Sequence, residues 1–405
     1  MTATPINEYT LDNNTIFSIV GKGLKLNTSD DVKVFVDTIA QMDDLKEIRL
    51  GGNTIGVEAG QALADILKTR STLKVAALSD IFTGRLLNEI PLALKALCDA
   101  FEETSLEELD LSDNAFGPAG AEPLIDFLSN TKTLRVLRLN NNGLGIGGGT
   151  MIAKALQASA DNARAENRPS SLHTIICGRN RLEDGSSQAL AQAFASHGTL
   201  KVVRMPQNGI RPDGIKTIVK GLSSCRELHH LDLQDNTFTS KGSQALAAAL
   251  THWPKLSILN IGDCLLGKSG GVALAEALEA GNNPALTHLH LQYNEISGNA
   301  VTILASAIKT HLKDLIHLEL NGNQFDADED EAKAIMDALA HWDHEDALDE
   351  LDDMEEVDSE EEEEEEEEDA LTEKAEEDED KEPASKDNDK DLENALVDQL
   401  NKTHI

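Results

Sequence analysis

The sequence predicts an α/β solenoid, and three recurring features predict that fold class. A frame of Leu-x-x-Leu-x-Leu-x-x-Asn, with an apolar residue two places later, returns from Leu45 to Phe325. Successive frames start close to 28 residues apart, and apolar residues at helical spacing follow each frame. One strand and one helix per repeat at this spacing is the leucine-rich repeat signature, with the spacing of ribonuclease inhibitor. We expect about 11 strand–helix repeats. The frames start at Leu45, Leu73, Leu106, Leu134, Leu172, Leu200, Leu228, Leu256, Leu286 and Leu315.

Each part of the frame has a physical role. The three apolar positions, as in Leu228, Leu231 and Leu233, should point from a short strand into the stack. The Asn should then close the turn, because its amide can bond backbone groups that the strand leaves unpaired. An amphipathic helix follows, as in residues 242–250. A weaker N-terminal unit around Leu24 and Leu26 lacks the Asn, as a capping repeat can.

Composition indicates one elongated domain and an acidic tail. The hydrophobic fraction of 40% with only 3% aromatic residues suits stacked aliphatic layers, and we expect the repeat domain to span residues 1–344. The net charge is −38, of which −26 lies in residues 345–405, where nine consecutive Glu begin at Glu360. Such a segment should be disordered. It is either an arm for a basic protein or a solubilising extension, and its charge argues against binding nucleic acid or an anionic membrane.

The cysteines and the N-terminus predict a soluble intracellular protein in a reducing compartment. Cys98, Cys177, Cys225 and Cys264 are far apart and form no Cys-x-x-Cys pair, so we expect structural thiols without a metal or disulfides. The N-terminus shows no signal-peptide pattern, and no apolar run approaches 18 residues. We expect no cofactor.

Residues 262–269 match the phosphate-loop pattern Gly-x-x-x-x-Gly-Lys-Ser. Alignment on the repeats makes Cys264 the turn residue and Leu266 a core residue of an ordinary repeat. A phosphate cradle needs a loop whose backbone is free to wrap the phosphates, so we interpret this match as coincidental. Lys268 should lie on the first helical turn at the rim. No other catalytic constellation occurs, and we expect no self-contained active site.

Function should lie where packing does not dictate the residue, and two such places stand out. The repeat that starts at Leu73 has Ile81 in place of the turn Asn and five additional residues. Insertions in solenoids concentrate on the binding face, so we expect this loop to project Asp80, Phe82, Thr83 and Arg85 from the rim. The second place is the position before the turn Asn, which the frame leaves unspecified. These residues should form a polar row for a protein partner: Gly52, Asp80, Asp113, Asn141, Arg179, Gln207, Asp235, Asp263, Tyr293 and Gly322, extended by Arg181 and Arg211.

These rim sequences closely resemble the Ran GTPase-activating protein family in its short fungal form. The resemblance runs through the whole repeat domain and into the Glu-rich tail. The segments that carry it are Ser79-Asp-Ile-Phe-Thr-Gly-Arg85, Leu111-Ser-Asp-Asn-Ala-Phe-Gly-Pro118, Asn141-Asn-Gly-Leu-Gly145, Cys177-Gly-Arg-Asn-Arg-Leu182, Leu231-Asp-Leu-Gln-Asp-Asn-Thr-Phe-Thr239 and Leu348-Asp-Glu-Leu-Asp-Asp-Met-Glu-Glu356.

The resemblance implies a cytoplasmic, monomeric protein that binds the GTP form of Ran and stimulates hydrolysis without holding the nucleotide. It implies that Asn141 helps to orient the glutamine of Ran, and that no arginine finger is used. Arg85 matches an important loop arginine, with docking and loop ordering as its expected role. The loop continues with Leu86 and Leu87, where a basic residue that pairs with Ran was expected. The contact residues expected on the rim are Asp80, Phe82, Thr83, Arg85, Asp113, Arg179, Arg211, Asp235 and Asp263.

Two other functional classes stay open at this point. The first is a non-catalytic repeat scaffold or inhibitor of the ribonuclease-inhibitor type, which is disfavoured by the presence of only four cysteines. The second is the acidic leucine-rich proteins that bind histones, whose repeats are fewer and shorter. GTP hydrolysis by Ran with and without the protein would separate all three.

Overall fold

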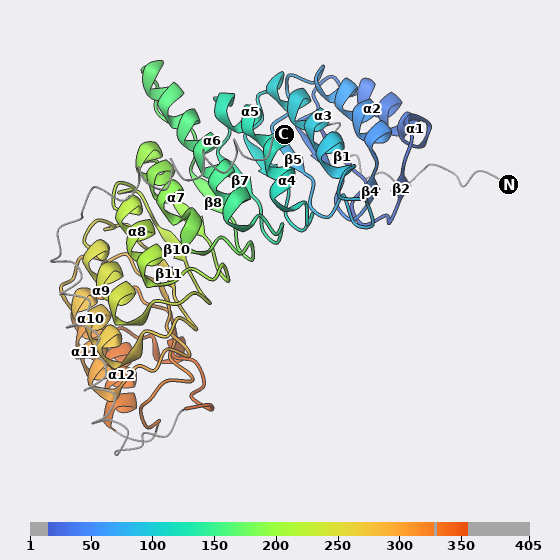
Figure 1. Cartoon of the computed structure of the whole chain (residues 1–405). Helices are drawn as coiled ribbons and strands as arrows, with labels where there is room; N and C mark the ends of the chain where they lie inside the picture. The colour runs from blue at the N-terminus through green and yellow to red at the C-terminus, as the bar shows by residue number, and fades with distance from the viewer. Residues whose placement is uncertain (1–14, 328–329, 355–405) are drawn as a thin grey trace, which may run out of the picture. The chain divides into compact units, whose positions relative to one another are not determined.

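The computed structural model describes residues 15–327 and 330–354, which lie in one compact unit. Its main feature is a sheet of 11 parallel strands that follow one another in chain order, so the predicted repeat fold is confirmed (Figure 1). The strands are β1 (Ile16–Ser18), β3 (Glu47–Arg49), β5 (Val75–Ala77), β6 (Glu108–Asp110), β7 (Val136–Arg138), β8 (Thr174–Ile176), β9 (Val202–Arg204), β10 (His230–Asp232), β11 (Ile258–Asn260), β12 (His288–His290) and β13 (His317–Glu319). A second, two-stranded sheet pairs β2 (Lys25–Leu26) with β4 (Thr54–Ile55).

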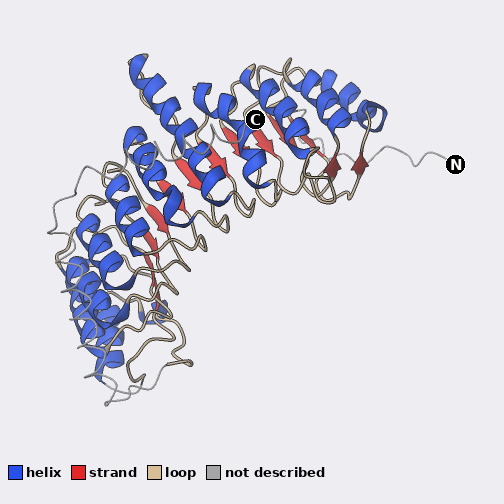
Figure 2. Cartoon of the chain, viewed as in Figure 1, coloured by secondary structure: helices blue, strands red, loops and turns tan. Residues whose placement is uncertain are grey.

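Helices cover the outer side of the main sheet and leave its inner side open (Figure 2). They are α1 (Ser29–Ala40), α2 (Val57–Leu67), α3 (Ile90–Glu102), α4 (Gly117–Ala121), α5 (Ile125–Asn130), α6 (Gly145–Ala165), α7 (Glu183–His197), α8 (Pro212–Leu222), α9 (Thr239–Leu250), α10 (Gly267–Glu279), α11 (Gly298–His311) and α12 (Asp330–Ala340), with 3-10 turns η1 (Glu122–Leu124) and η2 (Glu345–Ala347). No helix of the described part is both long and apolar enough to cross a membrane.

The frame Leu residues build the core as predicted. All ten lie at 3% exposure or less, and the middle residue of each strand in the main sheet is buried between the sheet and the helices. Equivalent residues pair across neighbouring strands, as in Leu231 with Val203 and Leu259. The longest interval between frames, from Leu134 to Leu172, is taken up by the 21-residue helix α6.

The turn asparagines form a continuous buried ladder. Asn142 is fully buried, its Nδ2 donates to the carbonyls of Leu111 and Leu139 at 3.0 Å, and its Oδ1 accepts from the backbone N–H of Asn114 at 2.9 Å. Asn142 in turn donates its own backbone N–H to Oδ1 of Asn180. Each asparagine therefore satisfies backbone groups of its own repeat and of the repeat before it, as the frame predicts. The ladder is interrupted at Ile81 and at Cys264.

Both ends of the repeat unit differ from expectation. The first strand of the main sheet lies at Ile16–Ser18, upstream of the expected unit around Leu24 and Leu26, and β2 joins only the small sheet. The expected boundary at residue 344 was too early. The Asp349 carboxylate accepts from the backbone N–H groups of Leu320 and Asn321, and the chain pairs beside β13 at Leu348. Residues 345–354 thus cap the last repeat, whereas the rest of the acidic tail, residues 355–405, lies outside the described residues.

Candidate functional site

The rim where the strands end carries the predicted polar row, but the backbone restricts it more than expected. Every residue before a turn position has a positive φ, from 50° at Asp80 to 72° at Gly52. Left-handed backbone favours Gly, Asn and Asp. Each of the nine residues from Gly52 to Tyr293 donates its N–H to a carbonyl of the next repeat, as Asn141 does to Gly178. The frame leaves the residue type at these positions unspecified, but the structure constrains their backbone geometry.

Asn141 lies on this rim beside Asp113. Both residues are exposed, and Asn141 Nδ2 donates to Asp113 Oδ1 at 3.0 Å. A carboxylate can only accept, so Asp113 orients the amide with its NH₂ group inward along the rim. Asn141 Oδ1 accepts no hydrogen bond from any residue that the structure describes. The pair therefore presents an oriented acceptor oxygen to solvent.

The insertion after Ile81 is held by Arg85. The half-buried guanidinium of Arg85 donates to Thr54 Oγ1 at 2.9 Å, to Thr54 O at 2.8 Å, to Leu26 O at 3.0 Å and to Asn27 Oδ1 at 2.7 Å. These acceptors lie at the edge of the small β2–β4 sheet, where the ladder lacks its Asn. Arg85 thus ties the inserted loop to the small sheet, with its guanidinium directed toward the protein.

One expected contact residue is misplaced. Phe82 was expected to project from the rim, but its side chain is only 2% exposed because it joins the core beside Ile81. In this loop, which lacks the turn Asn, the Phe82 ring packs into the hydrophobic core instead of projecting into solvent. Thr83 is exposed, and its hydroxyl donates to the Asp80 carboxylate, so these two residues do lie together on the rim.

The same loop exposes leucines that were not expected to bind anything. Leu86 and Leu87 are 65% and 71% exposed, and Leu92 on α3 is 60% exposed. These three are the most exposed large hydrophobic side chains among the described residues. In the sequence, the only indication was that Leu86 and Leu87 stand where a basic residue was expected.

Both signs of charge lie on the rim in the repeats that follow Asn141. Arg179, Arg181 and Arg211 are exposed, and their side chains make no hydrogen bond or ion pair with another described residue. A pocket of about 360 Å³ lies between successive turns of the rim, and its lining includes Arg181 together with Asp235 and Asp263. Burial, together with repulsion from Asp263, raises the pKa of Asp235. The rim thus offers unpaired cations beside a closely spaced acidic pair.

The phosphate-loop match is a rim turn. Cys264 and Leu266 are fully buried, which confirms the predicted core positions. The N–H groups of Asp263, Cys264 and Gly267 bond to the next repeat, at Gln292 O, Asn294 Oδ1 and Asn294 O. A Cβ placed on Gly262 would lie 2.5 Å from the Gln292 side chain, so the loop also has a neighbour against it. These N–H groups are not available to cradle phosphate.

Known proteins similar to this chain share its leucine-rich repeats. The chain matches the family described as Leucine Rich repeat at residues 44–64, 103–124, 224–247 and 282–305. It is 41% identical over 325 residues to Ran GTPase-activating protein 1 of Saccharomyces cerevisiae, an alignment that covers 78% of this chain and 80% of the yeast protein. It is 47% identical over 197 residues to Ran GTPase-activating protein 1 of Xenopus laevis, covering 48% of this chain and 34% of that protein. The ribonuclease inhibitor of Sus scrofa is 28% identical over 228 residues, covering 55% and 46%.

Proposed function

The chain belongs to the Ran GTPase-activating protein family, and from this membership we propose that it stimulates GTP hydrolysis by a Ran-type small GTPase. The observation that carries the proposal is the 41% identity to the yeast Ran GTPase-activating protein over four fifths of that protein's length. The occupied backbone of residues 262–267 supports a role as activator in which the nucleotide is held by the partner. In this proposal the chain is not an enzyme by itself.

The rim is the proposed binding surface. Successive strands lie about 4.8 Å apart, so Asp80, Asp113 and Asn141 fall within about 10 Å of one another. A protein partner of ordinary footprint, about 800 Å² per side, would cover them together with several neighbouring turns. Thr83 and the exposed Leu86 and Leu87 extend this surface at one edge. Arg179 and Arg211, followed by Asp235 and Asp263, extend it in the other direction.

The proposed mechanism places the partner's own glutamine. In GTPases this glutamine orients the attacking water. Asn141 Oδ1, left free by the bond from Nδ2 to Asp113, would accept from the side-chain NH₂ group of the glutamine. The glutamine oxygen then faces the water, and the oriented nucleophile lowers the activation barrier. Asp113 acts as a positioning residue, because it determines which atom Asn141 presents.

No arginine finger is needed in this mechanism. The guanidinium of Arg85 is engaged with four acceptors of its own chain, and withdrawing it would break all four bonds, including the one to the Thr54 carbonyl. We assign Arg85 to ordering the loop that carries Asp80 and Thr83. Arg179 and Arg211 are assigned to docking against acidic groups of the partner.

Single-turnover hydrolysis of GTP bound to Ran, measured against activator concentration, tests the proposal. The wild-type chain should accelerate hydrolysis and saturate. Asn141→Gly, which suits the left-handed backbone, should lower the saturating rate about a hundredfold with little change in half-saturation. Asp113→Asn should lower the rate less, because an amide can bond the Asn141 amide in either orientation. Absence of any acceleration by the wild type would refute the function, and full recovery of Asn141→Gly at high concentration would refute the role of Asn141.

The finer properties of the partnership are proposals as well. The chain should bind Ran loaded with a non-hydrolysable GTP analogue more tightly than Ran loaded with GDP, and it should act as a monomer in the cytoplasm. A basic protein is the proposed partner of the acidic tail. Titration of the two nucleotide states, light scattering, localisation of a tagged chain, and salt-dependent capture by the tail test these four statements in turn.

A further inference from the structure

Four side chains on the inner side of the last two strands form a compact square. β12 reads His288-Leu289-His290 and β13 reads His317-Leu318-Glu319, so the outer two residues of each strand face the open side of the sheet while each leucine is buried. The strands are parallel, with His288 opposite His317 and His290 opposite Glu319. Alternate residues on paired strands bring their side chains close together on one face.

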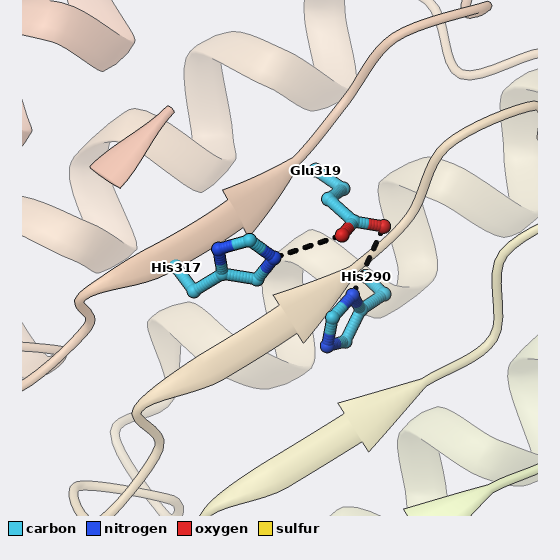
Figure 3. A group of neighbouring side chains, drawn as sticks. All are labelled: His290, His317 and Glu319. Carbon is cyan, nitrogen blue, oxygen red and sulfur yellow. Dashed lines mark hydrogen bonds and ion pairs between the residues drawn. The ribbon is translucent and has the colours of Figure 1, made fainter. Parts of the chain in front are cut away.

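The side chains of this square converge on the carboxylate. Glu319 Oε2 lies 3.0 Å from His290 Nδ1, and Glu319 Oε1 lies 2.8 Å from His317 Nε2 (Figure 3). One ligand atom from each of these three residues can be chosen so that all lie within 4.8 Å of one another. The ring of His288 stands 5.5 Å from that of His317 between centroids. The side chains are 19%, 42% and 26% exposed for His290, His317 and Glu319, so the cluster opens to solvent.

We propose that His290, His317 and Glu319 form a binding site for a divalent transition metal ion of the zinc class. Two imidazoles and one carboxylate are a recognised zinc ligand set, in which water or a further side chain completes the tetrahedron. Bonds of about 2.0–2.1 Å in a tetrahedron place ligand atoms about 3.3 Å apart, close to the two observed nitrogen–oxygen separations. A small opening of the cluster would admit the ion.

The chemistry of the cluster selects the class of metal. Imidazole nitrogen favours zinc, nickel and copper, whereas magnesium and calcium take oxygen ligands. His288 lies outside this group of three, so water is the proposed fourth ligand. Asp349, whose carboxylate bonds the backbone next to Glu319, adds negative charge on the side of the cap. A bound ion would connect β12 to β13.

The sequence carries this signal in a form that common motif patterns miss. No His-x-x-x-His or Cys-x-x-Cys spacing is present among these residues, and no metal site was expected. The pattern is His-x-His on one strand and His-x-Glu on the next, separated by one full repeat. Only parallel pairing in register brings the two halves together.

The proposal is tested by titrating the full chain with zinc in excess magnesium and measuring the binding by isothermal titration calorimetry. Magnesium occupies oxygen-only sites in the acidic tail and leaves imidazole sites available. The wild type should show one saturable zinc site, and the same site should give cobalt the visible absorption of a tetrahedral complex. His317→Ala and Glu319→Gln should each weaken binding at least about tenfold.

A matched control separates this site from other histidines. His311 is exposed on α11, the helix that connects β12 to β13, and His311→Ala should bind zinc as the wild type does. Circular dichroism of each variant checks folding, and His290→Asn provides a second lesion that preserves side-chain size. No saturable zinc binding by the wild type, or unchanged affinity in His317→Ala and Glu319→Gln, would overturn the proposal. The outcome is independent of the proposed GTPase activity.

Discussion

Asn141 and Asn142 are neighbours in sequence with opposite roles, and their replacement should separate stability from activity. Asn142 is fully buried and makes three hydrogen bonds to backbone groups through its amide. Removing the amide in Asn142→Ala breaks all three bonds: the Asn114 N–H loses its acceptor, and the Leu111 and Leu139 carbonyls keep only the bonds from Asn114 and Asn180. At about 1 kcal/mol for each lost bond, the free energy of unfolding should fall by about 3 kcal/mol.

Asn141 is exposed and makes one side-chain bond, to Asp113. Its left-handed backbone would strain an alanine by about 1 kcal/mol, so glycine is the clean replacement. Asn141→Gly should change the free energy of unfolding by less than about 0.5 kcal/mol, as surface substitutions usually do. The same variant should lose the acceleration of GTP hydrolysis.

Urea unfolding followed by circular dichroism, paired with single-turnover hydrolysis, measures both effects on the same preparations. Solenoids can unfold repeat by repeat, so hydrogen exchange of β6, β7 and β8 should accompany the global curve. We expect hydrogen exchange near residue 142 to become faster in Asn142→Ala. Exchange rates near residue 141 should stay unchanged in Asn141→Gly. If both variants lose equal stability, or if Asn142→Ala loses less than about 1 kcal/mol, the ladder does not carry the energy assigned to it.

Three further perturbations test other parts of the unit. Gly56→Ala places a Cβ 2.9 Å from Arg85 Nη1, so it should displace the guanidinium and speed hydrogen exchange in residues 81–89, as Arg85→Ala should; unchanged exchange in both would contradict the loop-ordering role. The pKa of Asp235 is raised in the folded chain, so at neutral pH its negative charge lowers the free energy of unfolding. This loss disappears as the pH falls through the raised folded pKa to the ordinary value of 3.8. Asp235→Asn should therefore raise the unfolding temperature at neutral pH and not below pH 3.8, and an equal gain at both would contradict this cause. Burial raises the pKa of Cys177 to about 12 and that of Cys225 to about 11, so both should resist alkylation at neutral pH until urea unfolds the chain.

The repeat architecture was predictable because packing repeats itself. Every frame leucine expected in the core is buried, and the intervals between frames located the insertion after Ile81. Because ten repeats share one period, an ambiguous residue in any single repeat does not obscure which positions form strands and helices. The ends were less predictable: β1 and the cap formed by residues 345–354 each have only one neighbouring repeat, and neither follows the frame.

The sequence could suggest a rim site from the exceptions to the frame, but not how individual side chains lie there. Phe82 lies in a loop that departs from the frame, so the frame could not indicate which way its ring turns. Arg85 likewise gave no sign that its acceptors lie near Leu26 and Thr54, more than 30 residues earlier. The His-x-His and His-x-Glu pair at β12 and β13 required the register of two strands. The sequence alone therefore does not determine contacts between distant residues where the chain departs from the repeat.

The left-handed backbone of the rim row changes which residues are informative about function. Seven of its ten positions hold Gly, Asp or Asn, which the geometry favours without any partner. An acidic residue such as Asp263 is therefore weak evidence for binding by itself. Arg179 is stronger evidence, because an arginine at a φ of 56° has no such conformational advantage and its side chain has no partner among the described residues.

Arg179→Gly uses this difference as a test. Glycine relieves the left-handed strain, worth about 1 kcal/mol, so the variant should be at least as stable as the wild type. If Arg179 docks the GTPase, the same variant should need several times more activator for half-saturation while reaching the wild-type rate. A loss of saturating rate would instead assign Arg179 to the reacting phosphates, and unchanged half-saturation would remove it from the interface.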